Sequence, residues 1–371
     1  MASLPAGCAA GALNMVLIPS SWARWGFLLA MLWCGVGHAQ APLPSGSPPY
    51  PLGTQSGASR QAWVAAAALS RGIRIDAALE TSTSLSESSS TAETIARAGF
   101  RTVRLTVPQS SLHAAWMVEP GQESRLALLD ETIEALLARG LHVVLGVQDG
   151  GTEHAGSPQM REESLSAAQA RHRQSVLIWQ HLARRYASRP QRLLFEVSFA
   201  QGAASTLKNR QATSLLKAIR KSNPTRVLVL GWADAIGLPQ LELPGDRHLI
   251  VGITHVEPFR FTRQGVSGIS GAEQWRGTTC CSAQELQLMA LPLDIAKTWS
   301  LENRYPVWVR DFVSYQDIPV ELRARHARLV RQAAEERGFS WVYGDFSAGF
   351  GIYETASRVW KMPLLQALLG P

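Results

Sequence analysis

Charged side chains accompany several of the short apolar runs in this 371-residue sequence. Arg104 lies within one run, Asp149 lies two residues after another, and Asp311 lies close to the end of a third. Two carboxylates near each other can divide acid–base or nucleophilic work, one holding a proton while the other stays ionised. A neighbouring arginine favours the ionised form and orients it. Asp149, Asp311 and Arg104 are therefore candidate catalytic residues.

Each of these residues also has a structural interpretation. Arg104 can be a buried charge partner that serves packing, and Asp149 can cap the turn that begins at Gly150. Glu196 lies four residues before Ala200, which places it roughly 13 Å deeper along an extended strand. We therefore interpret Glu196 as an interior structural carboxylate.

Eight apolar or β-branched runs would position these residues, and helical patterns separate the runs. Several runs are apolar throughout, as is typical of strands buried on both faces. They cover residues 72–77, 102–107, 142–147, 192–198, 226–232, 249–255, 306–312 and 340–346. This order predicts an α/β fold with a single (β/α)8 barrel, in which chemistry takes place at the carboxyl ends of the strands. A doubly wound sheet is the second choice, because no glycine-rich phosphate motif follows the first strand.

The first 40 residues are typical of a secretory signal peptide. Arg24 precedes a short apolar run that ends in Gly37-His38-Ala39. The run is shorter than the roughly 20 residues of a membrane span, although an uncleaved anchor is an alternative. We predict a signal peptide over 1–40, a flexible Pro/Gly/Ser-rich leader over 41–60 and the barrel over 61–371. The protein would then be secreted or periplasmic, with no membrane span after cleavage.

Charge and cysteine content narrow the functional classes further. The net charge of +7 comes mostly from scattered arginine, and no dense basic run with interleaved aromatic residues predicts nucleic-acid binding. After signal removal only Cys280 and Cys281 remain, as free thiols or as a disulfide between neighbours. No further Cys or His has the spacing of a zinc site. We expect neither a metal nor a cofactor.

Four segments carry a resemblance to a known family: 99–104, 195–201, 258–265 and 345–353. Together they make the chain similar to the cellulase-type, family 5 glycoside hydrolases over most of its mature length. The resemblance implies a (β/α)8 barrel and descent from enzymes that cleave β-linked polysaccharides.

The positions that carry catalysis in that family differ here. The family uses two glutamates about 5–5.5 Å apart, one as acid and base, the other as nucleophile. Where the family has Asn-Glu-Pro, this chain has Phe199-Ala200-Gln201, so Ala200 occupies the acid/base position. Where the family has Gly-Glu-Phe, this chain has Arg310, Asp311 and Phe312, so Asp311 occupies the nucleophile position.

Supporting positions have changed as well. Gln148 and Thr254 stand where the family has histidines, Val256 where it has a tyrosine, and Gly344 where a tryptophan floors the sugar site. Sliding the sixth strand by one residue would instead place His255 at a substrate-binding position.

Two tryptophans, Trp232 and Trp275, are candidates for a glycan platform. Core packing explains each of them equally well.

Two functions follow from this pattern. The first is a catalytically impaired barrel that binds a polysaccharide, or a component of a polysaccharide synthesis or export system. The second is an active hydrolase with relocated carboxylates, Asp311 as nucleophile or base and Asp149 as acid, with Arg104 orienting Asp311. An inverting reaction would tolerate the wider separation of such a pair.

Overall fold

The computed structural model describes residues 57–76, 85–112, 123–148, 165–199 and 203–370, which belong to one compact unit. The predicted signal peptide, most of the predicted leader, Asp149, Ala200 and Gln201 lie outside these residues. Among the helices described, none is long and apolar enough to cross a membrane.

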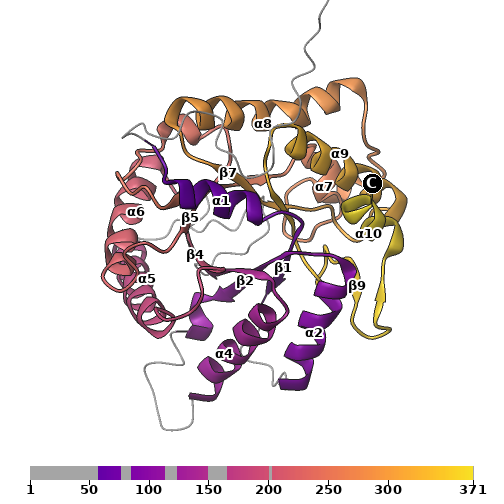
Figure 1. The fold of residues 1–371 in the computed structure, drawn as a ribbon. Helices are drawn as coiled ribbons and strands as arrows, with labels where there is room; N and C mark the ends of the chain where they lie inside the picture. Colours follow the sequence, from indigo (N-terminus) through magenta and orange to yellow (C-terminus); the bar gives the residue numbers. More distant parts are fainter. Residues whose placement is uncertain (1–56, 77–84, 113–122, 149–164, 200–202, 371) are drawn as a thin grey trace, which may run out of the picture. The chain divides into compact units, whose positions relative to one another are not determined.

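Eight parallel strands form a closed barrel in sequence order, which confirms the predicted fold (Figure 1). They are β1 (Gly72–Asp76), β2 (Thr102–Pro108), β3 (His142–Gln148), β4 (Leu193–Ser198), β5 (Leu228–Ala233), β6 (Leu249–His255), β7 (Val307–Phe312) and β8 (Trp341–Tyr343). Each of the eight predicted runs overlaps the corresponding strand, with boundaries that differ by at most a few residues.

Helices cover the outside of the barrel, as Figure 1 shows. They are α2 (Leu85–Ala98), α4 (Glu123–Ala138), α5 (Leu165–Arg185), α6 (Ser205–Arg220), α8 (Ala283–Asn303), α9 (Val320–Glu336) and α10 (Met362–Leu369). The connection from β6 to α8 contains the short helices α7 (Phe259–Arg263) and η2 (Ala272–Trp275), and a small hairpin, β9 (Tyr353–Glu354) and β10 (Val359–Trp360), precedes α10. Side chains on the outer face of each strand pack against these helices, as Phe195 does against Trp179 with ring centroids 5.5 Å apart.

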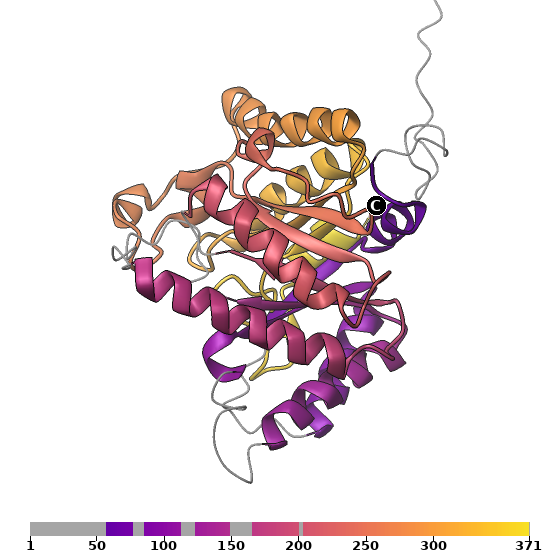
Figure 2. The ribbon, with the colours of Figure 1, turned by 90° about the vertical axis from the view of Figure 1, so that its left-hand side faces the viewer.

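The interior of the barrel is apolar at the end where the strands begin. Its buried side chains are Val144, Leu194, Val227, Val229, Ile250, Trp308 and Val342. The helix α1 (Arg60–Ala68) packs Ala62 and Ala66 against them and closes this end of the barrel (Figure 2). Burial of this layer on all sides removes its apolar surface from water.

The predicted leader extends too far. The amide of Ala58 donates to the carbonyl of Arg304 at 2.8 Å, and the Ser59 side chain caps α1 by accepting from the Ala62 amide. Residues 57–60 are therefore part of the barrel unit, because the helix that closes the barrel needs its cap.

Candidate functional site

The buried polar contacts inside the barrel centre on Glu196, near the carboxyl end of β4. The Glu196 carboxylate is fully buried and accepts from Arg104 at 2.6 Å to Nε and 3.1 Å to Nη2. Arg310 Nη1 donates to the same carboxylate and, at 3.3 Å, to the Ser198 hydroxyl. Burial would raise the pKa of Glu196, but the two arginines outweigh it and lower the pKa to about 2. We call Arg104, Glu196 and Arg310 the Glu196 layer.

Glycines make room for this layer. Arg310 reaches from β7 to β4 over Gly252 and Gly231, where an added Cβ would lie 3.0 Å from Arg310 Cδ and 2.9 Å from Arg310 Nη1. A Cβ at Gly146 would lie 3.4 Å from the Glu196 carboxylate. Glycine within a strand often marks such a close approach. The interior at this height is therefore filled by an arginine side chain.

A second group of charges surrounds Arg74 on β1. Its Nη1 donates to Asp311 Oδ2 at 2.6 Å, its Nη2 donates to Asp345, and its Nε lies 3.3 Å from Asp76 Oδ1. One guanidinium thus contacts three carboxylates. We call Arg74, Asp76, Asp311 and Asp345 the Arg74 cluster.

A β-bulge brings the two groups together on β7. Val309–Phe312 on β7 pairs with Trp341–Tyr343 on β8, so the longer stretch holds one extra residue. A bulge of this kind breaks the strict alternation of a strand. The consecutive residues Arg310 and Asp311 can therefore both contribute to the interior charges.

Asp311 lies against Gly344, the residue after β8, which has no side chain. A Cβ built on Gly344 would collide with Asp311 Oδ1 and with Val313. The Asp311 side chain is only 14% exposed, and its Oδ1 has no hydrogen-bond partner among the residues described. Its carboxylate therefore occupies the space that the glycine leaves and is held towards Arg74.

The charge of the cluster also depends on Arg263 and on the pKa of its member Asp76. Arg263 is buried, and burial lowers its pKa to about 10, while the charges of Asp311 and Asp345 act in the opposite direction. Burial raises the pKa of the Asp76 carboxyl, which Arg74 lowers, whereas the nearby Asp345 raises it further. Burial and Asp345 thus outweigh Arg74, and the pKa of Asp76 lies above its ordinary value.

The contacts of Arg104 agree with both of its predicted roles, that of a buried charge partner and that of a residue that orients Asp311. Its two hydrogen bonds go to Glu196, and its Nη1 lies 3.8 Å from Asp311 Oδ2. The closer orienting partner of Asp311 is Arg74. Asp149 and Ala200 lie outside the described residues.

The positions at which this chain differs from the family pattern lie on different strands of the barrel. Thr254 pairs in register with Asp311, Gln148 ends β3, and Phe199 packs edge-on against Trp232 with ring centroids 6.2 Å apart. Val256 follows β6 and is half-buried.

His255 lies in the wall of the barrel. It is 2% exposed, and neither of its ring nitrogens has a hydrogen-bond partner among the described residues. Burial, then the charges of His326 and Arg337, lowers the pKa of His255 to about 3. Both of these neighbours belong to α9 or its end, so His255 faces the helix layer rather than a ligand in the mouth.

The two tryptophans differ in exposure. Trp232 is fully buried, its Nε1 donates to the Gly237 carbonyl at 2.9 Å, and Lys208 Nζ lies over its ring. It is a core residue and offers no free face to a sugar. Trp275 in η2 is half-buried against Phe259, with ring centroids 5.8 Å apart, and keeps part of its surface accessible.

Arg74, Arg310, Asp76 and Lys208 were not predicted as site residues. The sequence holds a weak signal for one of them, because Arg310 replaces the family glycine and two strand glycines accompany it. Arg74 gives no such signal, since its partners Asp311 and Asp345 are more than 230 residues away in the sequence.

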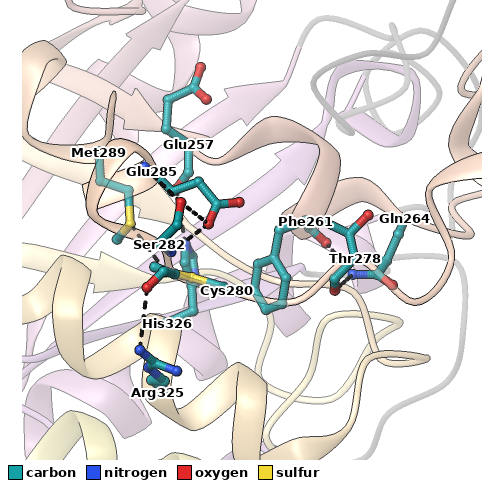
Figure 3. The surroundings of a disulfide bond; sticks show 11 residues. Glu257, Phe261, Gln264, Thr278, Cys280, Ser282, Glu285, Met289, Arg325 and His326 are labelled. Atoms are coloured by element: carbon teal, nitrogen blue, oxygen red, sulfur yellow. Dashed lines mark hydrogen bonds between the residues drawn. A yellow bond between two sulfur atoms is a disulfide. The ribbon is translucent and has the colours of Figure 1, made fainter. Parts of the chain in front are cut away.

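Cys280 and Cys281 form a disulfide where the β6–α8 connection meets α8 (Figure 3). Cys280 is buried, and Arg325 of α9 donates to the Cys281 carbonyl at 3.3 Å. Ser282 and Glu285 form a capping box that starts α8 directly after the pair. The hydrogen bond from Arg325 thus links the end of the connection that carries Trp275 to the helix layer. No set of three or more potential metal ligands occurs in the described part of the chain.

Comparison with known proteins gives consistent matches. Endoglucanase H of Acetivibrio thermocellus is 28% identical over 206 residues, which are 52% of this chain and 22% of that protein. Endoglucanase C of the same organism is 27% identical over 179 residues, 46% of this chain and 51% of that protein. The chain therefore covers about half, or less, of these curated relatives.

A solved structure resembles nearly the whole barrel. The cellulose synthase subunit Z (CcsZ) of Clostridioides difficile superposes with a TM-score of 0.69 at 26% identity, over 81% of this chain and 99% of that one. The family model of cellulase (glycosyl hydrolase family 5) matches residues 71–349. This chain therefore belongs to the cellulase family, glycosyl hydrolase family 5.

Proposed function

We propose that this protein is exported, binds a β-linked polysaccharide at the mouth of its barrel and does not cleave it by the two-glutamate mechanism of its family. The observation that carries this proposal is the position of Asp311. Its carboxylate is tied to Arg74 at 2.6 Å and occupies the space over Gly344. In a nucleophile held in this way, Oδ2 pairs with a cation, and Oδ1 fills the space where a side chain at position 344 would begin.

The expected loss of rate is large. The alanine at position 200 carries no proton, and loss of a general acid costs about 10²- to 10⁴-fold. A displacement of the nucleophile by about 1 Å costs on the order of 10²-fold more. Glu196 does not replace the acid, because its pKa of about 2 keeps it ionised.

The similarity to CcsZ supports a more specific role. That protein is described as a cellulose synthase subunit, and it matches this chain over nearly all of its own length. We propose that this protein likewise works beside a polysaccharide synthesis or export system, as an accessory that holds the glycan.

One observation favours a second candidate, an inverting hydrolase. Asp76 and Asp311 contact the same guanidinium of Arg74, at 3.3 and 2.6 Å, so two carboxyls lie close together, and glycoside hydrolases work with a pair of carboxyls. The raised pKa of Asp76 suits an acid, with Asp311 as the base. In this candidate Asp76 takes the place for which the sequence offered Asp149.

A panel of β-glucans and β-mannans tests both candidates with the purified protein. Affinity electrophoresis measures binding, and reducing-end release measures turnover. We expect retardation by at least one glycan and no turnover. Turnover that Asp76→Asn abolishes would establish the inverting hydrolase, and a lack of both binding and turnover would overturn both candidates.

A further inference from the structure

The end of the barrel at which the strands begin is rich in arginine. The connections that lead into the eight strands all lie within the described residues: 69–71, 99–101, 139–141, 186–192, 221–227, 241–248, 304–306 and 337–340. They hold ten arginine and lysine side chains and two carboxylates, Glu242 and Asp246, which gives them a net charge of +8. The whole chain carries +7, so its excess positive charge is concentrated at this end.

Backbone hydrogen bonds hold several of these arginines side by side along the rim. The amide of Arg101 donates to the carbonyl of Arg71 at 3.0 Å, and the Arg101 carbonyl accepts from the His142 amide at 2.9 Å. The Arg192 carbonyl accepts from the next amide, that of Val143, also at 2.9 Å. The rim from β1 to β4 therefore presents three neighbouring arginines, and all three are exposed.

The helix α1, which closes this end of the barrel, extends the basic surface (Figure 2). The Arg247 carbonyl accepts from the Ser59 amide that precedes α1 at 2.6 Å, and Arg247 Nε donates to the Gly57 carbonyl at 3.2 Å. Arg60 begins α1 and is exposed, and Val64 on the same helix is 49% exposed. This face therefore combines cations with an exposed apolar side chain.

The carboxylates near this end do not neutralise the exposed arginines. Each pairs with another arginine at 2.6–2.9 Å, as is seen for Glu93, Glu134, Asp246 and Asp294. No ion pair within the described ranges involves Arg71, Arg101, Arg192 or Arg247. The helix dipole favours cations only within about the last turn of a helix. It does not account for Arg192 and Arg247, which lie seven residues beyond the ends of α5 and η1.

We propose that this face of the barrel binds the surface of a membrane that contains anionic lipids. Arginine matches the geometry of phosphate groups, and cations spread over a whole rim suit a surface that carries many separate anions. An apolar side chain among cations is typical of segments that lie at the bilayer interface. Because the parallel strands all run from this face to the mouth, the mouth would be turned away from the bilayer. The inference goes beyond the proposed glycan binding and does not depend on it.

The test is co-sedimentation of the purified protein with vesicles of phosphatidylcholine alone and of phosphatidylcholine mixed with phosphatidylglycerol. At about 0.01 M salt, where the Debye length is about 30 Å, the protein should bind the anionic vesicles at least about tenfold more tightly than the neutral ones. Each arginine near an anionic bilayer strengthens binding about fivefold. The double variant Arg71→Gln/Arg101→Gln should therefore bind the anionic vesicles about 25-fold more weakly. Its thermal midpoint should not change, because neither side chain forms an ion pair in the described part of the chain.

Arg210→Gln/Arg328→Gln is the matched control, since it removes the same charge from exposed positions on α6 and α9, at the sides of the barrel. It should weaken vesicle binding by less than about twofold. All variants keep the same N-terminal residues, so any binding through those residues is common to them.

Three results would overturn the inference. They are equal binding to both kinds of vesicle, equal weakening in the two double variants, and a lowered thermal midpoint of Arg71→Gln/Arg101→Gln with unchanged vesicle binding. Soluble polyglutamate is the further probe. Binding of polyglutamate as tight as that of the anionic vesicles, at equal concentration of charge, would indicate a surface for acidic polypeptides and would also overturn the inference.

Discussion

The Glu196 layer and the Arg74 cluster carry opposite excesses of charge within one barrel. In the Glu196 layer two arginines share one carboxylate, and both oxygens of that carboxylate are paired. In the Arg74 cluster one arginine contacts three carboxylates, and Asp311 Oδ1 has no partner among the described residues. The first group has an excess of positive charge, and the second an excess of negative charge.

The difference indicates which group serves structure and which serves ligands. A fully paired buried network rigidifies its surroundings, whereas an incompletely paired one at a mouth is a place where a ligand or proton can bind. Glu196 is inaccessible and ionised, so it serves as the anchor on which both arginines depend. Asp76 and Asp311 lie nearer to solvent and keep unused capacity.

Loss of the anchor should have the largest effect. Glu196→Gln leaves Arg104 and Arg310 without their shared anion, and removal of one member of a buried ion pair costs about 3–5 kcal/mol. Urea denaturation would measure this decrease in the free energy of unfolding. Glu336→Gln on the exposed face of α9 is the control and should stay within about 0.5 kcal/mol. A cost below about 1 kcal/mol for Glu196→Gln would show that the layer is not structural.

Lowering the pH should distinguish the contribution of the Glu196 layer to stability from that of the buried histidines His255 and His326. Burial lowers the pKa of His326 to about 4, and that of His255 to about 3, whereas the unfolded side chains titrate near 6.5. The unfolded state therefore binds more protons, and stability should fall between pH 6.5 and 4 by about 1.4 kcal/mol per pH unit for each histidine.

Glu196 acts in a lower pH window. Its folded pKa of about 2 lies below the ordinary 4.5, so its contribution is present above pH 4.5 and is lost as the pH falls towards 2. Between pH 6.5 and 4, the free energy of unfolding of His255→Gln should depend less on pH than that of the unmodified protein. For Glu196→Gln, the pH dependence should be reduced only below pH 4.5. An unchanged slope in His255→Gln would contradict its burial as a neutral ring.

A methyl group at Gly344 should disturb the Arg74 cluster specifically. The added Cβ of Gly344→Ala would collide with Asp311 Oδ1 and Val313, and overpacking of this kind costs about 1–3 kcal/mol. Gly349→Ala provides the control, because Gly349 has no positive φ and its added Cβ would lie in ordinary contact, 3.5 Å from Tyr315 Cε2. Thermal unfolding that is unaffected by Gly344→Ala would show that Asp311 does not occupy this space.

The smallest effect is expected at Asp76. Partial burial, then the charges of Asp345 and Asp311, raise its pKa, and its side chain is 38% exposed. Asp76→Asn should therefore leave stability at neutral pH unchanged or raise it by less than about 1 kcal/mol. A clear destabilisation in urea would mean that the pair with Arg74 outweighs the repulsion within the cluster.

Sequence patterns predicted the eight strands because buried parallel strands are apolar throughout and helices separate them. They also identified Glu196 as an interior carboxylate from its depth along the strand. They did not predict Arg74, whose partners come from β7 and the residue after β8, nor the bulge that turns both Arg310 and Asp311 towards the interior. Such features depend on strand register across the closed barrel, which no local pattern encodes.

The most direct test of impaired hydrolysis is a time course of reducing-end release with a glycan that the protein binds, comparing the unmodified protein with Asp311→Asn at high protein concentration. The account predicts the same background rate for both. Release by the unmodified protein that Asp311→Asn abolishes would contradict it.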